Sequence, residues 1–254
     1  MAVTTNALRE RIEANRRLTP YVPRLVVDWL RSEPATVART IEGSLVFADI
    51  SGFTRLSEAL ARRGKVGAEL MRDALNVVFT ALLDDAYDYG ASLIKWGGDA
   101  LLLLFDGPSH EVRASRAAWE MQRTLDRVGR LRAPGGTVVL RMSVGITSGP
   151  IQFFLVGDIH RELLVAGPTA TEVVVVEGIA DAGEIALSPG LARLLPRPSR
   201  GTRKEAAILL ANPPEAPRER APDVGDVSAI NITDCIPVAV RAHVLLERRP
   251  GCNR

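Results

Sequence analysis

Residues 45–54 read Leu45-Val-Phe-Ala-Asp49-Ile-Ser-Gly52-Phe-Thr54, an apolar run that ends in a carboxylate and a small turn. An apolar strand that ends in an acid and then breaks at glycine holds the carboxylate rigidly at a sheet edge, where it can take a divalent cation. The alternative interpretation is a helix N-cap after a buried strand, because Asp and Ser are both favoured at such junctions. This stretch alone supports the two interpretations equally.

A second carboxylate, Asp99, favours the metal interpretation. Residues 92–96 and 100–105 are short apolar runs joined by Gly97-Gly98-Asp99, and two glycines allow a tight hairpin because they adopt positive φ without steric cost. We therefore expect Asp99 at a hairpin turn. Two carboxylates at the edge of one sheet can chelate a pair of hard cations through oxygen, and neither is near a His or Cys that would favour zinc.

The residues that follow Asp49 supply a complementary feature for phosphate. Gly52, Phe53 and Thr54 begin the expected helix, and backbone N–H groups at a helix N-terminus can hold phosphate oxygens. Paired magnesium ions serve phosphoryl chemistry by clamping nucleotide phosphates and stabilising the attacking oxygen. The combination predicts a nucleoside triphosphate as the ligand.

The composition is that of an ordinary globular chain of 254 residues, with 46% hydrophobic and 24% charged residues. A formal net charge of +2 and dispersed arginines give no reason to expect nucleic-acid binding. Cys235 and Cys252 form no Cys-x-x-Cys pattern, so we expect neither a disulfide framework nor a thiolate metal site. The N-terminus lacks the apolar core of a signal peptide, and no apolar run approaches the ~18 residues of a membrane helix. We expect a cytoplasmic protein without membrane insertion.

Helical and strand-like patterns alternate along the chain, but hairpins intervene between them. This order predicts an α+β fold with a mainly antiparallel sheet covered by helices, not a doubly wound parallel sheet. The expected helices cover residues 51–62, 66–89, 109–128 and 169–180, and the expected strands cover 44–50, 92–96, 100–105, 138–147, 151–156, 163–166 and 184–188. The expected regions are a helical lead-in at 1–43, a domain at 44–195, and a Pro- and Arg-rich linker with a C-terminal extension at 196–254.

Several short motifs occur in the order of one known family. Phe47-Ala-Asp-Ile-Ser-Gly-Phe-Thr54 and Lys95-Trp-Gly-Gly-Asp-Ala-Leu-Leu102 resemble the metal-binding pair of class III nucleotidyl (adenylate/guanylate) cyclases. The further matches are Val144-Gly-Ile146 with Gly149-Pro150, Val156-Gly-Asp158, Val165-Ala-Gly167 and Gly183-Glu-Ile-Ala-Leu-Ser188. The resemblance covers residues 43–195, and within the family it is strongest to the first cyclase domain of tandem, soluble, bicarbonate-responsive adenylyl cyclases.

This resemblance implies a ferredoxin-like βαββαβ core with additional αβ elements, and a catalytic site formed at the interface of two such domains. Asp49 and Asp99 match the aspartates that bind two Mg²⁺ or Mn²⁺ ions, and the Ile50 carbonyl is a further expected ligand. The nucleotide contacts that the resemblance implies are Ile50, Ser51, Gly52, Phe53, Thr54, Lys95 and Gly98.

The sequence departs from the family where the other half of the site is expected. The family has an Asn and, four residues later, an Arg on the helix after the Gly-x-Thr turn, and these positions are Thr171 and Val175 here. Losing a charged group that stabilises the transition state typically costs on the order of a hundredfold in rate. The positions that read the base are Leu93 and Leu164, and leucine cannot replace a polar contact. We therefore assign no catalytic side chain beyond the metal pair, and a homodimer should be feeble or inactive.

Lys95 has two interpretations that the sequence leaves equal: it caps the hairpin by pairing with Asp49 or Asp99, or it contacts ligand. In the bicarbonate-responsive relatives the matching lysine helps to hold the anion together with an arginine on the later helix. That helix reads Glu172-Val-Val-Val-Val-Glu177 here, without arginine, so we do not expect bicarbonate sensing. The histidines are expected to be solvated side chains without a catalytic role: His110, His160 and His243.

Two hypotheses of function follow from these residues. In the first, the domain supplies the metal aspartates to a class III cyclase that converts ATP to cyclic AMP and pyrophosphate in intracellular signalling. A complementary cyclase domain, in a heterodimer or tandem, or a second copy in a homodimer, then supplies the rest of the site. In the second, the chain is a non-catalytic cyclase-homology module that binds nucleotide or a partner and regulates an effector. The residues do not determine the preference for ATP over GTP.

Overall fold

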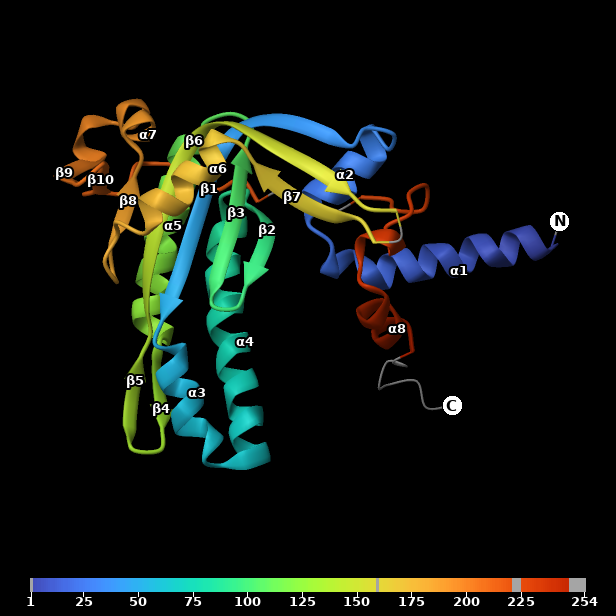
Figure 1. Ribbon diagram of the computed structural model, residues 1–254, viewed down its shortest axis with the longest axis horizontal. Helices are drawn as coiled ribbons and strands as arrows, with labels where there is room; N and C mark the ends of the chain where they lie inside the picture. Colours follow the sequence, from blue (N-terminus) through green and yellow to red (C-terminus); the bar gives the residue numbers. More distant parts are fainter. Residues whose placement is uncertain (1, 159, 221–224, 247–254) are drawn as a thin grey trace. The chain divides into compact units, whose positions relative to one another are not determined.

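The computed structural model describes residues 2–158, 160–220 and 225–246 of the chain (Figure 1). It divides into two compact units. The first unit comprises Met1–Thr40, Gln152–Val165 and Pro222–Arg254, and the second comprises Ile41–Ile151 and Ala166–Ala221. Within the described residues, no helix is both long enough and apolar enough to cross a bilayer.

The second unit contains most of a twisted, mainly antiparallel sheet, whereas most of β7, the start of β1 and the end of β6 belong to the first unit. Among the described residues the strand order is β2-β3-β1-β6-β8-β10-β9, and β7 pairs separately with β6. The strands are β1 (Ala38–Ser51), β2 (Ser92–Gly97), β3 (Ala100–Asp106), β6 (Arg141–Val156), β7 (Glu162–Ala166), β8 (Ile185–Leu187), β9 (Arg200–Lys204) and β10 (Ala207–Leu210). The pairs β1–β3, β2–β3, β8–β10 and β9–β10 are antiparallel, whereas β6–β8 is parallel.

Helices cover the sheet of the second unit unequally. The long helices α4 (Gly64–Asp88) and α5 (His110–Val128) lie together on one face, and the short helix α6 (Pro168–Glu177) lies on the other (Figure 1). The remaining helices of this unit are α3 (Phe53–Ala61), α7 (Pro189–Leu194) and the 3₁₀ turn η2 (Arg197–Ser199). The order β1–α4–β2–β3–α5–β6 confirms the predicted βαββαβ core and the α+β class.

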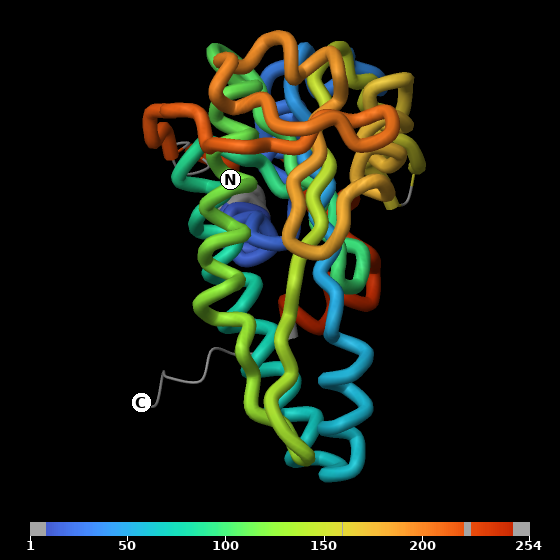
Figure 2. Tube along the Cα trace, turned by 90° about the vertical axis from the view of Figure 1, so that its left-hand side faces the viewer, coloured from blue at the N-terminus to red at the C-terminus, as the bar shows by residue number. Residues whose placement is uncertain are grey.

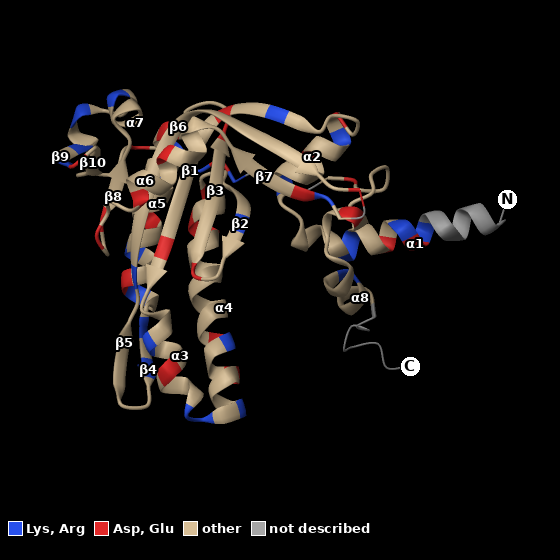
Figure 3. Cartoon of the chain, viewed as in Figure 1, with Lys and Arg blue, Asp and Glu red and all other residues tan. Residues whose placement is uncertain are grey.

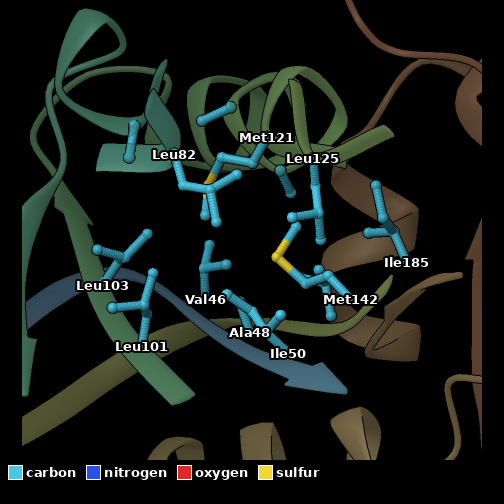
Figure 4. Close-up of a cluster of buried hydrophobic side chains, with 14 of the residues drawn as sticks. Val46, Ala48, Ile50, Leu82, Leu101, Leu103, Met121, Leu125, Met142 and Ile185 are labelled. Atoms are coloured by element: carbon cyan, nitrogen blue, oxygen red, sulfur yellow. The ribbon is translucent and has the colours of Figure 1, made fainter. Parts of the chain in front are cut away.

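Alternation along β1 explains how the core is formed. Val46, Ala48 and Ile50 are fully buried, whereas Phe47 and Asp49, on the opposite face of the strand, keep partial exposure. Burying a Val or Ile side chain contributes roughly 1.5–3 kcal/mol. Figure 4 shows the buried set together: Val46, Ala48, Ile50, Leu82, Leu101, Leu103, Met121, Leu125, Met142 and Ile185. The sheet therefore buries one face against α4 and α5 and carries Asp49 on the other.

Three predictions about the elements were wrong. The predicted strands 138–147 and 151–156 are one continuous strand, β6, because Gly149 adopts φ +149° and does not turn the chain. A two-stranded hairpin of β4 (Arg130–Ala133) and β5 (Gly136–Val139) was missed, although Pro134-Gly-Gly136 is a turn signal. Residues 200–210, predicted to belong to a linker, form β9 and β10 and extend the main sheet.

The first unit joins the two ends of the chain. Its elements are α1 (Ala2–Leu18), η1 (Thr19–Tyr21), α2 (Arg24–Ser32), η3 (Thr233–Cys235) and α8 (Val238–Leu246), together with most of β7. The fully buried Asn15 amide donates to the carbonyls of Val227 and Ile230 over 2.8 and 2.7 Å. Arg17 donates to the carbonyl of Leu245 over 3.0 Å. The C-terminal stretch thus packs on the N-terminal helix. Cys252 lies outside the described residues.

Candidate active site

The two predicted metal-binding carboxylates lie on adjacent strands. Asp49, near the end of β1, is in register with Ala100 at the start of β3, and Asp99 occupies the turn immediately before Ala100. The backbone N–H of Ile50 donates to the carbonyl of Asp99 over 3.2 Å. Figure 3 shows acidic colour at the end of β1 and at the tip of the β2–β3 hairpin, and basic colour on β2. The sheet therefore brings together the two acids that are 50 positions apart in the sequence.

The electrostatics of this pair suit a cation. Burial raises the pKa of the Asp49 carboxyl, and the negative charge of Asp99 raises it further. Two adjacent carboxylates repel each other, and a divalent cation between them would remove that repulsion.

Two protein ligands match the way in which magnesium or manganese is bound together with substrate. They are too few for a cation that is held by protein side chains alone. The described residues contain no group of three or more His, Cys, Asp or Glu side chains that could hold a metal ion. Mg²⁺ is commonly bound by one or two carboxylates together with substrate phosphates and water, rather than by a closed protein cage. The pair Asp49 and Asp99 therefore fits a site that bound nucleotide would complete.

The turn after Asp49 is fixed by Gly52. This residue adopts φ +105° and precedes α3, with its carbonyl accepting from the N–H of Leu56 over 3.1 Å. A Cβ at Gly52 would lie 3.1 Å from both Leu140 Cδ2 and the Val139 carbonyl, so the close contact and the positive φ both disfavour a side chain here. No side chain caps α3, and the Ser51 hydroxyl donates instead to the Arg141 carbonyl over 3.3 Å. The alternative of Asp49 or Ser51 as an N-cap is therefore wrong.

The tip of the β2–β3 hairpin is held by Trp96. Its ring packs on Phe79 of α4 with centroids 4.2 Å apart, and its indole N–H donates to the Gly98 carbonyl over 2.9 Å. Lys95 is exposed next to it on β2, and the pairing of β2 with β3 shifts register between Leu93 and Lys95. These contacts of Trp96 position the turn that carries Asp99.

Comparison with known proteins identifies the domain. A family model described as "Adenylate and Guanylate cyclase catalytic domain" matches residues 36–211, more than half of the chain. The chain belongs to this cyclase family. The matched range extends past the expected end at residue 195 and includes β9 and β10.

Individual relatives within the cyclase family agree with this assignment. The chain is 26% identical over 186 residues to adenylate cyclase type 10 of Mus musculus, a match that covers 71% of this chain and 12% of that protein. It therefore spans about an eighth of the length of this relative. The crystal structure of the adenylyl cyclase CyaB from P. aeruginosa shares the fold, with a TM-score of 0.55, 21% identity, and coverage of 72% of this chain and 98% of that one. A bacterial light-regulated adenylyl cyclase matches 94% of this chain and 66% of its own, with a TM-score of 0.60 and 14% identity.

At the positions where this cyclase domain departs from the family motifs, the side chains are apolar or form a hydrogen bond to their own backbone segment. Val175 and its neighbour Val174 are 56% and 54% exposed on α6, and Leu164 on β7 is 41% exposed. The Thr171 hydroxyl donates to the Gly167 carbonyl of its own helix over 3.4 Å. Leu93 is half-buried on β2. These side chains offer no charge to a phosphate and no polar group to a base.

Glu177 is an acid near the site that the sequence interpretation missed. It ends α6 and accepts a hydrogen bond from the Ser143 hydroxyl over 2.7 Å. Burial raises its pKa and the charge of Asp49 adds to the rise, whereas the bond from Ser143 acts the other way. Gly145 of β6 allows this approach, since a Cβ there would lie 2.4 Å from the Glu177 nitrogen. The glycine at 145 was a signal that α6 packs closely on β6.

His110 does not fit the expectation of a solvated histidine. It is 8% exposed, and its Nδ1 lies 2.8 Å from the Ser44 hydroxyl, which is itself 2.5 Å from the Ser148 hydroxyl. Ser44 is fully buried, so no substrate can reach this group. The cluster joins α5 to β1 and β6 and has a structural role.

Proposed function

We propose that this chain supplies the metal-binding half of an adenylate cyclase active site, which converts ATP to cyclic AMP and pyrophosphate. The observation that carries the proposal is the juxtaposition of Asp49 and Asp99 on a domain that has Val175 in place of the arginine. The relatives with adenylate cyclase in their names support ATP over GTP.

The roles of the residues follow from their positions. Asp49 and Asp99, with the Ile50 carbonyl, would hold two Mg²⁺ or Mn²⁺ ions, which neutralise phosphate charge and assist the 3′ hydroxyl in its attack on the α-phosphate. Ser51, Gly52, Phe53 and Thr54 would hold phosphate oxygens with backbone N–H groups at the start of α3. Lys95 and Gly98, on the hairpin that carries Asp99, would lie beside the triphosphate.

A complementary domain is the partner that we propose. Thr171 and Val175 can neither assist the ribose nor stabilise charge on the transferred phosphate, and Leu93 and Leu164 cannot read a base. A second cyclase domain with the Asn, the Arg and the polar base contacts would complete the site, in a heterodimer or a tandem protein. A homodimer would lack the Asn, the Arg and the polar base contacts in both of its subunits. We place this activity in the cytoplasm, on the ground that the sequence shows no disulfide framework.

Complementation tests the proposal. The chain alone should form almost no cyclic AMP from ATP and Mn²⁺, and mixing it with a purified class III domain that carries the Asn and Arg should restore turnover. Asp49→Asn in this chain should abolish the restored activity, whereas Glu172→Gln, an exposed acid on α6, should leave it unchanged. Strong turnover by the isolated chain would overturn the half-site proposal.

The second candidate is a non-catalytic module that binds nucleotide or a partner and regulates an effector. The same observation favours it, because Val175 removes the charged group on which turnover depends. Calorimetric titration with Mn²⁺ and a non-hydrolysable ATP analogue separates the candidates, with Asp99→Ala as the control. Binding that requires both aspartates but gives no product with any complementary domain would favour the module.

A further inference from the structure

The segment that follows β10 is bound along its length to the second unit, although its composition predicts a mobile linker. We define residues 211–220 as the strap. At its start, the Ala211 nitrogen donates to the Ser199 carbonyl over 3.0 Å, and the Asn212 amide donates to the Pro198 carbonyl over 2.8 Å. Pro214 is buried, and Ala216 packs against the main core. The strap is therefore anchored before its charged part begins.

The arginines of the strap pair with oppositely charged aspartates at the end of α4. Arg218 pairs with Asp88 over 3.3 Å, and its guanidinium lies 6.0 Å from the centre of the Tyr89 ring. Arg220 pairs with Asp84 over 2.8 Å and with Asp88 over 3.4 Å. The two aspartates are one helical turn apart on α4 and so face the same way. Figure 2 shows the strap in orange, running as an open chain across the end of the helices.

Glu219 binds on the opposite side, to a buried cation. Arg113 of α5 is only 4% exposed, and its guanidinium lies 3.9 Å from the Glu219 carboxylate. The same guanidinium donates to the carbonyls of Tyr89 over 2.8 Å and Pro108 over 3.1 Å, and to that of Asp106. A buried cation is costly unless a carboxylate and hydrogen bonds offset its charge. Glu219 supplies that carboxylate from the strap.

These contacts converge on the turn between α4 and β2. Gly90, with φ +81°, leaves room there for the strap, because a Cβ would lie 3.0 Å from the Glu219 carbonyl and 2.5 Å from Arg113 Nη1. The turn at Tyr89 and Gly90 leads directly into β2, the first strand of the hairpin that carries Asp99. The strap therefore fixes the point from which this hairpin starts.

We propose that residues 211–220 form a releasable strap that clamps the α4–β2 turn and holds the β2–β3 hairpin in place. The arginines of these ion pairs, Arg218 and Arg220, are more than half exposed, and such pairs are individually weak, which makes the strap sensitive to salt and to competing charges. The strap lies outside the Asp49–Asp99 site, and its role does not depend on the proposed function.

Hydrogen exchange measured by mass spectrometry tests the strap in the full chain. The charge reversal Arg218→Glu with Arg220→Glu should speed exchange of amides 89–94 by about tenfold, the combined effect expected from several weak ion pairs and one cation–π contact. Adding Asp84→Arg and Asp88→Arg should restore slow exchange by reversing the other side of each pair. Exchange across residues 141–151 of β6 should stay unchanged in all variants, which shows that the whole domain has not been destabilised.

A matched control uses arginines that are exposed on β4 and β9. Arg132→Glu with Arg203→Glu makes the same change in net charge and should leave exchange at 89–94 at the wild-type rate. Glu219→Gln is a second variant of the strap that makes no charge reversal, and it too should speed exchange at 89–94. The proposal is overturned if the Arg218 and Arg220 reversals leave exchange at 89–94 unchanged, or if the control variant speeds it equally.

Discussion

The N–H of Ile50 donates to the carbonyl of Asp99 over 3.2 Å, and this bond joins the backbone of the two segments that carry the acids. Asp49 precedes Ile50 on β1, so the main chain, rather than a flexible side chain, sets how the two carboxylates are placed. Trp96 strengthens the arrangement from the other side by donating to Gly98. Under the proposed function, a pair positioned in this way would be organised for a cation before the cation binds.

Removing either carboxylate should weaken Mn²⁺ binding. Because no group of three or more His, Cys, Asp or Glu side chains is available to a metal in the described residues, Asp49→Asn or Asp99→Asn should each lower the affinity at least about tenfold, or about 1.4 kcal/mol. Calorimetry in the presence of a non-hydrolysable ATP analogue measures the change. Glu172→Gln, on the exposed face of α6, is the control, and an equal loss in that variant would argue for non-specific attraction.

The raised pKa of Asp49 predicts a pH-dependent stability in the absence of metal. Its carboxyl binds a proton more tightly in the folded chain than in the unfolded chain, so ionisation costs stability as pH rises through the raised pKa. Asp49→Asn should therefore raise the Tm at neutral pH by up to a few degrees, since about 1 kcal/mol corresponds to about 2–4 °C for a chain of this size. The gain should shrink as pH falls and Asp49 becomes protonated. A Tm that drops at neutral pH would contradict this account.

The affinity for Mn²⁺ should rise with pH, whereas the stability of the metal-free chain should fall. A carboxylate must be ionised to bind the cation, so the affinity should rise as pH increases through the raised pKa of Asp49 and then level off. Titrations at several pH values measure this, and Asp49→Asn should flatten the profile. A profile of the same shape in that variant would assign the titration to another group.

Gly52→Ala should destabilise the domain more than Gly135→Ala. Both glycines have positive φ, at +105° and +92°, so alanine is strained at each by roughly 1 kcal/mol. Only at Gly52 would the new Cβ also press on Leu140 and the Val139 carbonyl, at 3.1 Å. Thermal unfolding measures the difference, and equal losses of Tm would show that the close contact relaxes without cost.

The core of the fold was predictable because its elements carry strong local patterns. The apolar run of β1, the helical stripes of α4 and the Gly97-Gly98 turn each depend on neighbours in sequence, and each formed where expected. β9 and β10 were missed because both are short, because β9 is polar, with Arg200 and Lys204 at its ends, and because β10 is stabilised by long-range pairing with β8. The strap was mistaken for a linker because its partners, Asp84, Asp88 and Arg113, are far away in sequence.

The site was predictable only to the extent that motifs mark it. Asp49 and Asp99 could be paired because each sits at the end of a recognisable strand. Glu177 and His110 could not be placed, since the burial of both depends on which strand packs beneath the helix. Ser143 and Ser44, their partners, carry no signal of that contact in the sequence.

Repairing the missing half within this one chain is the most direct test of the half-site account. A variant with Thr171→Asn, Val175→Arg, Leu93→Lys and Leu164→Asp restores the four absent positions, and its homodimer would then contain complete sites. We predict that it forms cyclic AMP from ATP and Mn²⁺ at least about a hundredfold faster than the wild-type chain, and that adding Asp49→Asn abolishes the gain. A wild-type chain that turns over ATP as fast as the repaired variant, or a gain that survives Asp49→Asn, would contradict the account.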